Sequence, residues 1–553
     1  MEKRVVLAII LSVLVLIGYQ YFFVKPALKT AAPPVAAPTA GPEGPQGKVE
    51  GQAAPPAVEA AAPEKAQPAP DLKPVSAQAE EEIVVETSLY RAVWSNKGGV
   101  LKSWRLKKHF SDAKEPVELV PAAAGETGKF PFSLGAEDGA LAADLNAAFF
   151  ETSGKSVILE DGAKNEIHFS FSDGKSVRAE KTFRFTGGSY EVGIELHLWK
   201  AGREIPASLL WGPGIGNPTP KEIKNQVASA NKGAAVYAGG KVYRMDERRY
   251  KAETSAYNFA DWAAYEENYF AAIFFFPAQK GQAEFLQQVR GQSQKPLYFV
   301  SASAPQTAFI GPKDFEFLKA FGRDAKKIIS FGAFGAIAEI LLAAVKLFHR
   351  LIPNWGAAII ILTLVIKILF FPLTYSSTKS MAKMAELQPK IKALQAKYKK
   401  AKRDIDQRRQ MNEEMMKLYK EHGVNPAGGC LPLLIQLPIF WGVFRMLAVS
   451  VEFRQAPFCL WIKDLSIKDP YYVTPILMGI TQYITQKMTP TSADPAQAKM
   501  MLLMPVIMTV FFLNFQSGLI LYWLTTNVLQ IAQQAIMNKM IAKHKRERDG
   551  KRA

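Results

Sequence analysis

The sequence predicts a polytopic α-helical membrane protein with six transmembrane helices and a large all-β domain. Apolar runs long enough to span a bilayer occur at the N-terminus and in the C-terminal third. Between them lies a long region in which hydrophobic residues alternate with polar ones. The chain of 553 residues exceeds one domain, and its net charge of +18 would, in a membrane protein, first report sidedness.

Residues 1–24 are predicted to form a signal-anchor transmembrane helix. The apolar run VVLAIILSVLVLIGYQYFFV follows Lys3 and Arg4, and at about 1.5 Å per residue it can cross the hydrocarbon core. The alternative is a cleaved signal peptide, whose apolar core is usually shorter. Residues 25–82 are rich in Ala, Pro, Gly and Gln and are predicted to be a disordered tether, because they cannot bury enough apolar surface to fold.

Residues 83–320 are predicted to form the all-β domain. In EIHFSFSDG and SYEVGIELHLW the apolar residues recur at every second position, as in strands with one buried face. Turn signals such as SNKGG, TGG and GPGIGNP separate such runs. A β-sandwich is the expected architecture.

The C-terminal part is predicted to be helical and mostly embedded in the membrane. The expected segments are an amphipathic helix on the periplasmic membrane surface (329–352), a second transmembrane helix (355–374), a cytoplasmic helical hairpin (375–429), four further transmembrane helices (430–450, 471–488, 500–515 and 517–537) and a basic cytoplasmic tail (538–553).

Charge distribution decides the sidedness. The loop 375–429 holds thirteen Lys and Arg against six Asp and Glu, and the tail after Met537 holds seven against two. Six spans place both segments and the N-terminus in the cytoplasm, as the positive-inside rule requires, and place the β-domain in the periplasm of a two-membrane bacterium. A seventh span at 329–352, which Glu339, Lys346 and His349 interrupt, would place both basic segments outside. The two cysteines provide no disulfide framework.

Lys367 lies inside an apolar span, where an unpaired charge costs about 2.5–3.5 kcal/mol. The predicted topology puts polar residues of four helices at the same inner depth as this lysine. They are Thr363, Gln436, Gln482, Thr485, Gln486, Asn527 and Gln530. The predicted spans after the first contain no Asp or Glu, so the sequence favours a hydrophilic groove open to a polar or acidic guest. The alternative is a lysine that merely snorkels to the inner interface.

The hairpin and the tail are candidate contact surfaces. Met411, Met415 and Leu418 recur at helical spacing in the hairpin, which predicts either an internal core or a binding surface for a guest or partner. The tail KHKRERDGKR is either an electrostatic arm for ribosomal RNA or anionic lipid, or an ordinary positive-inside anchor.

Long stretches of the C-terminal part resemble the YidC-type membrane protein insertases of Gram-negative bacteria. The resemblance rests on VNPAGGCLPLLIQLPIFWGVFRML from Val424 and MPVIMTVFFLNFQSGLILYWLTTN from Met504, in the right order. It implies a five-helix insertase core that inserts hydrophobic segments of nascent inner-membrane proteins, alone or with the Sec translocon. It also implies contact with ribosomes and lipids, a monomer sufficient for function, no cofactor, metal or enzymatic activity, and a periplasmic β-supersandwich without catalytic duty.

The same resemblance assigns roles to single residues. The family usually has arginine where this chain has Lys367, which keeps the charge but loses the planar fork of donors. The substrate-contact path of the family maps onto Phe440, Met478, Phe511, Tyr522 and Trp523. Trp523 stands where the family has a tyrosine.

Two other functions are alternatives on the sequence. A solute transporter would also place a charge in a cavity, but it typically shows inverted repeats and unwound half-helices. A carbohydrate-active enzyme would need an acid/base pair in the β-domain, and His168 and His197 have no discernible partner pattern.

Overall fold

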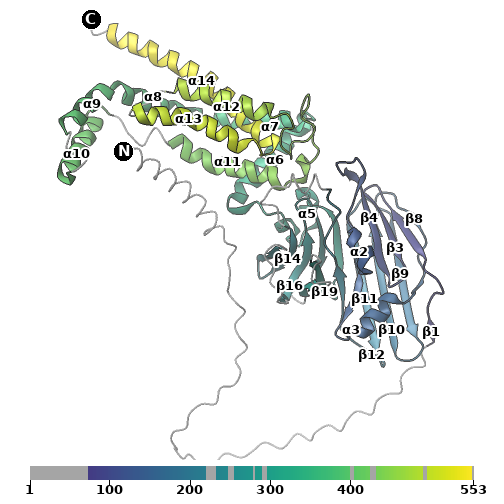
Figure 1. Cartoon of the computed structure of the whole chain (residues 1–553). Helices are drawn as coiled ribbons and strands as arrows, with labels where there is room; N and C mark the ends of the chain where they lie inside the picture. The colour runs from purple at the N-terminus through teal and green to yellow at the C-terminus, as the bar shows by residue number, and fades with distance from the viewer. Residues whose placement is uncertain are drawn as a thin grey trace, which may run out of the picture. The chain divides into compact units, whose positions relative to one another are not determined.

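The computed structural model describes residues 73–219, 232–246, 255–277, 281–288, 296–398, 404–423, 431–489 and 495–550. Strands dominate the first part of this range and helices the last part (Figure 1). The predicted signal-anchor helix and nearly all of the predicted tether lie outside the described residues.

Within the described residues the strands form two sheets, one of fifteen strands and one of five. The larger sheet runs in the order β1 (Pro74–Val75), β9 (Lys164–Asp173), β10 (Val177–Thr186), β11 (Glu191–Lys200), β20 (Thr307–Pro312), β17 (Phe270–Phe275), β16 (Ser255–Glu266), β18 (Gly281–Gln288), β19 (Leu297–Ser303), β13 (Ala207–Trp211) and β6 (Ser133–Ala136), with β7 (Glu151–Thr152), β12 (Arg203–Glu204), β14 (Gly233–Ala238) and β15 (Lys241–Asp246) paired to its members. The smaller sheet runs in the order β5 (Pro116–Glu118), β4 (Val100–Phe110), β3 (Tyr90–Ser95), β2 (Glu82–Glu86) and β8 (Val157–Ile158).

The predicted alternation is present in these strands. In β11, Val192, Ile194 and Leu198 are buried, and in the neighbouring β10 every second side chain from Ala179 onward is buried. One of the inward residues of β10 is a lysine, Lys181, which is fully buried. Its Nζ donates to the backbone oxygens of Gly98 at 2.7 Å, Phe132 at 2.8 Å and Gly99 at 3.2 Å. The ammonium therefore provides a donor for backbone oxygens in the turn after β3 and just before β6, which would otherwise lack one.

A second buried charged group joins β15, β16 and the chain after β20. Glu266 accepts from Arg244 Nε at 2.8 Å and from Lys313 Nζ at 3.0 Å, and only 1% of the glutamate side chain is exposed. The Nη2 of Arg244 also donates to the backbone oxygens of Lys327 and Ile328. The triad thus ties the sheet to the segment that leads into the helical part.

The helices follow the predicted order. Two short helices, α2 (Ala122–Thr127) and α3 (Gly139–Ala147), belong to the β-rich part. The others are α5 (Phe315–Phe321), η2 (Ala325–Ile328), η3 (Gly332–Phe334), α6 (Gly335–Leu351), α7 (Trp355–Leu369), α8 (Phe371–Glu386), α9 (Gln388–Lys397), α10 (Ile405–Glu421), α11 (Leu431–Val449), η5 (Val451–Phe453), α12 (Val473–Met488), α13 (Pro495–Phe512) and α14 (Ser517–Gly550).

One straight stretch among the described residues, Gly332–Leu351, is by itself long and apolar enough to cross a membrane. The bent pair α7 and α8 would be a second if it counts as one span, whereas the apolar stretches Ile435–Val449 and Met501–Phe512 are shorter. The predicted number of six spans is not confirmed by this criterion. The long stretch that meets it contains α6, which the sequence places on the membrane surface.

The predicted second span, 355–374, covers two helices. A bend of 59° separates α7 from α8. Pro372 lies in the first turn of α8, where it has no N–H to donate and its ring clashes with the preceding turn, so α7 cannot continue straight through it. At the other end, α14 runs without a break from Ser517 to Gly550 and includes most of the predicted basic tail.

Two glycines let neighbouring helices approach closely. A Cβ at Gly479 of α12 would lie 2.0 Å from Thr509 Oγ1 of α13, and a Cβ at Gly442 of α11 would lie 2.9 Å from Ile337 of α6. The outward sides of α12 and α13 carry exposed apolar side chains such as Ile480, Ile507 and Val510. This pattern is typical of helices that face lipid.

Asp469 fixes the start of α12. Its Oδ1 accepts from Trp461 Nε1 at 3.0 Å and Tyr471 N at 2.9 Å, and its Oδ2 accepts from the N and Oγ1 of Thr474, both at 2.8 Å. We expect Asp469→Ala to speed hydrogen exchange of the Thr474 amide at least tenfold, about 1.4 kcal/mol, because the cap of the first turn is lost. Asp469→Asn keeps an acceptor and should have a smaller effect. Unchanged exchange in the alanine variant would contradict the capping role.

Candidate substrate groove

Lys367 lies in the last turn of α7 and reaches across to α14. Its Nζ donates to Gln530 Oε1 at 2.8 Å, and both side chains are partly buried. The described parts of the predicted spans after the first contain no Asp or Glu, so the partner of this cation is a neutral amide. Because α7 and α14 pack against each other, the hydrogen bond joins two neighbouring helices.

Three further hydrogen bonds join α14 to α12. Asn527 Nδ2 donates to the backbone oxygen of Met478 at 3.2 Å and to Thr481 Oγ1 at 3.4 Å. Trp523 Nε1 donates to Gln482 Oε1 at 3.2 Å. Trp523, Asn527 and Gln530 recur at intervals of four and three residues, so one face of α14 carries all three polar groups.

An aromatic cluster adjoins this polar face. The ring of Trp523 contacts Phe440 of α11 edge-to-face, with centroids 4.9 Å apart, and Phe512 of α13 at 5.3 Å. The indole therefore has its N–H on the polar side and its ring among apolar residues, an arrangement that suits an amphipathic aromatic residue. Trp523 marks the boundary between polar and apolar packing in the helix bundle.

The other predicted groove residues differ in their surroundings. The hydroxyl of the buried Tyr522 faces the side chains of Gln436 and Thr526, which places Gln436 beside α14. Thr363 is 1% exposed and its hydroxyl donates to Ile359 O at 2.7 Å, so this residue is satisfied within its own helix. Thr485 likewise donates to the backbone of Thr481, and Gln486 is partly buried.

The predicted path residues fall into two groups. Phe440 and Trp523 are in contact, and Met478 and Tyr522 are buried beside them in the same bundle. Phe511 is 59% exposed. Its neighbour Phe512, which the sequence reading missed, is the residue that contacts Trp523.

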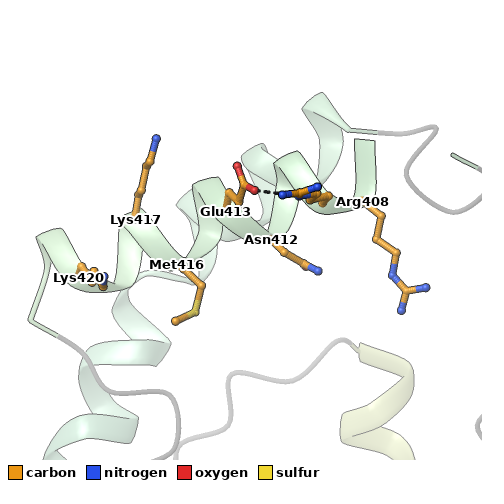
Figure 2. Close-up of a pocket in the computed structure, with 7 residues that line it drawn as sticks. Arg408, Asn412, Glu413, Met416, Lys417 and Lys420 are labelled. Carbon is orange, nitrogen blue, oxygen red and sulfur yellow. Dashed lines mark hydrogen bonds and ion pairs between the residues drawn. The ribbon is translucent and has the colours of Figure 1, made fainter. Parts of the chain in front are cut away.

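A hollow lies along one helix of the hairpin formed by α9 and α10. A cavity of about 620 Å³ follows α10 and is lined by Arg408, Arg409, Asn412, Glu413, Met416, Lys417 and Lys420 (Figure 2). Lys397 of α9 and Glu414 of α10 form an ion pair of 2.8 Å that closes the hairpin. The lining combines four cations with one exposed methionine. Among the described residues no group of His, Cys, Asp and Glu could hold a metal ion.

Comparison with known proteins identifies the family. Residues 82–344 match the family described as YidC periplasmic domain, and residues 347–545 match the family described as 60Kd inner membrane protein. A membrane protein insertase YidC from Geotalea daltonii is 38% identical over 98% of this chain and 100% of its own length. The chain belongs to the YidC family of membrane protein insertases. A further YidC relative, from Geobacter metallireducens, is 36% identical over 98% of this chain and 99% of its own.

A solved structure described as an active YidC insertase is also similar, with 21% identity, coverage of 83% of this chain and 94% of its own, and a TM-score of 0.35. Membership in the YidC family makes this protein a non-enzymatic insertase of nascent membrane proteins in the bacterial inner membrane, with a periplasmic β domain. The alternative of a solute transporter is not favoured.

Proposed function

We propose that this YidC-family protein moves the hydrophilic flank of a client segment through a groove lined by α7, α11, α12 and α14. The observation that carries the proposal is the polar row of Lys367, Gln530, Asn527 and Gln482, next to the aromatic cluster around Trp523. Gln436, Thr363, Thr485 and Gln486 belong to the proposed groove as well, although the hydroxyls of the two threonines donate to their own helices.

The physical reason is the cost of carrying polar groups across hydrocarbon. Backbone and side-chain polar groups without partners cost several kcal/mol each in lipid. A hydrated inner half of the bundle shortens the apolar path, and the cation of Lys367 attracts acidic residues of the flank. The client helix then leaves into lipid because burial of its apolar surface is favourable, at about 25 cal/mol per Å². Phe440, Met478, Phe511, Tyr522 and Trp523 form its proposed path.

We further propose six spans with both termini in the cytoplasm and α6 on the periplasmic surface. The contacts of α6 support this placement. Ile337 faces Gly442, Ser330 just before the helix accepts from Arg445, and Lys346 forms an ion pair of 2.5 Å with Glu452. All three partners belong to the last turns of α11 or to η5 after it. The ion pair puts charged groups of α6 beside the end of α11, as expected for a helix on a membrane surface.

The proposed partners beyond nascent membrane proteins are the Sec translocon, the ribosome and membrane lipids, and we propose that a monomer suffices. The support for ribosome contact is electrostatic. The cavity of α10 is lined by Arg408, Arg409, Lys417 and Lys420, and the tail adds a second basic segment.

We expect Lys367→Ala to reduce the insertion of acidic-flanked clients about tenfold, because a charge-assisted contact of roughly 1.5–3 kcal/mol is lost. Insertion into liposomes that contain the purified full chain measures this effect. A matched client with a neutral flank should be much less affected, and Lys367→Arg should retain activity. Equal insertion of both clients by the alanine variant would remove the charge from the mechanism.

A further inference from the structure

The contact that holds the groove cation has a neutral partner. Lys367 Nζ is bound to a neutral amide oxygen, Gln530 Oε1, at 2.8 Å. The described residues of the predicted spans contain no carboxylate that could serve as an alternative partner. A glutamate would have nearly the same shape as this glutamine. A glutamate at position 530 would neutralise the lysine within the protein, whereas glutamine leaves its charge uncompensated.

The hydrogen bond between Lys367 and Gln530 stabilises the ammonium more than no partner would, but less than a carboxylate would. A hydrogen bond to a neutral oxygen removes part of the cost of an ammonium in apolar surroundings, but only a carboxylate also supplies the opposite charge. An acidic side chain that enters the groove can therefore displace the amide. An internal carboxylate could not be displaced as easily, because breaking such a buried pair leaves an uncompensated charge.

The neighbours of Gln530 on α14 are held elsewhere. Asn527 is bound to the backbone of α12, and Gln534 Nε2 donates to Asn538 on its own helix. Gln530 faces α7 instead. It contacts the last turn of that helix, one turn before the bend of 59° at Phe370. Release of Lys367 from Gln530 would remove this hydrogen bond between the two helices.

We propose that Gln530 is a positioning residue that holds the ammonium of Lys367 in a neutral, exchangeable hydrogen bond and is displaced by the carboxylate of a client. The inference rests on the proposed function of Lys367 and adds the specificity of the site. Gln530 keeps the cation from turning towards lipid and holds it where the carboxylate of an acidic flank can reach it, which keeps the groove selective for such flanks.

The test uses the purified full chain in liposomes and two clients that differ only in an acidic or a neutral flank. The readout is the ratio of their insertion rates. Gln530→Glu should lower this ratio about tenfold, because the new carboxylate competes with the client for Lys367. The neutral-flanked client should be inserted at nearly the unchanged rate, which reports that the variant is folded.

A second variant and a double variant complete the test. Gln530→Leu removes the acceptor without adding a charge, so Lys367 loses its position and the ratio should fall, but by less than in Gln530→Glu. In the Lys367→Ala background, Gln530→Glu should not lower the ratio further. A fall that is equally large without Lys367, or equal losses for both clients, would overturn the proposal. If Lys367→Ala alone left the ratio unchanged, the proposed function itself would fail, which is a separate outcome.

Discussion

Glu266→Ala is expected to lower the free energy of unfolding of the periplasmic domain by about 3–5 kcal/mol. The substitution leaves Lys313, whose side chain is 3% exposed, and Arg244 without the carboxylate that both contact. Two cations would then remain in a low-dielectric environment beside each other. Arg244 would also lose the restraint that directs it to the segment before α6.

The pH dependence of this triad has a defined sign. Burial alone would raise the pKa of Glu266, but Lys313 and Arg244 outweigh it and hold the pKa below its usual range. A lowered folded pKa gives stability that is present above the unfolded pKa, near 4.5, and lost as the pH falls through the folded value. The domain should therefore become less stable in acid.

Denaturant unfolding of the detergent-solubilised full chain, followed by hydrogen exchange of β15, β16 and β20, measures the effect of Glu266→Ala. Glu195 is the matched control, because it forms an ion pair of the same length, 2.8 Å, with Arg184 at the surface. Glu195→Ala should cost less than about 1 kcal/mol. Equal losses for the two variants would show that burial of the triad contributes nothing.

Lys181→Met is expected to destabilise the same domain by about 2–4 kcal/mol. The side chain has similar length, but it leaves the backbone oxygens of Gly98, Gly99 and Phe132 without the donor that they share. Part of this loss is offset, because methionine has no charge that must be removed from water. Lys164→Met at an exposed position of β9 is the control and should change stability by less than about 0.5 kcal/mol.

Lys181 predicts a pH dependence of the same sense in a higher pH window. Burial lowers its pKa from 10.5 to about 7. Between these values the unfolded chain binds more protons than the folded chain, so stability rises with pH from about 7 towards 10. In this window the free energy of unfolding of the wild type should rise relative to that of Lys181→Met by about 1.4 kcal/mol per pH unit. A difference that stays constant from pH 7 to 10 would contradict the lowered pKa.

The sequence predicts the β strands well because their signal is local. Alternation in β9 and β11 directly reports which side chains are buried. Lys181 and Glu266 carry no such signal. A lysine in a strand is normally a surface residue, and its burial depends on three backbone oxygens from segments about 50 to 80 residues away.

The groove can also be predicted in part from local sequence signals. Depth along predicted spans groups Lys367 with Gln530 and Asn527, and the structure brings these helices together. Depth alone does not give rotation about the helix axis. It therefore cannot tell that Phe512 rather than Phe511 contacts Trp523, or that the hydroxyl of Thr363 turns back to its own backbone. Prediction of the bend after Leu369 requires that the effect of Pro372 on the preceding turn be considered.

The hydrogen bond between Lys367 and Gln530 joins a charged group to a neutral one, so the pair responds to an electric field. One elementary charge that crosses a membrane potential of 100 mV gains or loses about 2.3 kcal/mol. On the proposed topology, a negative cell interior pulls the ammonium towards the cytoplasm and restrains the end of α7. A client carboxylate bound to Lys367 cancels that pull, and the same potential then favours passage of the acidic flank to the positive side. The membrane voltage thus restrains the empty groove, no longer restrains the loaded one, and drives the acidic flank once it leaves Lys367.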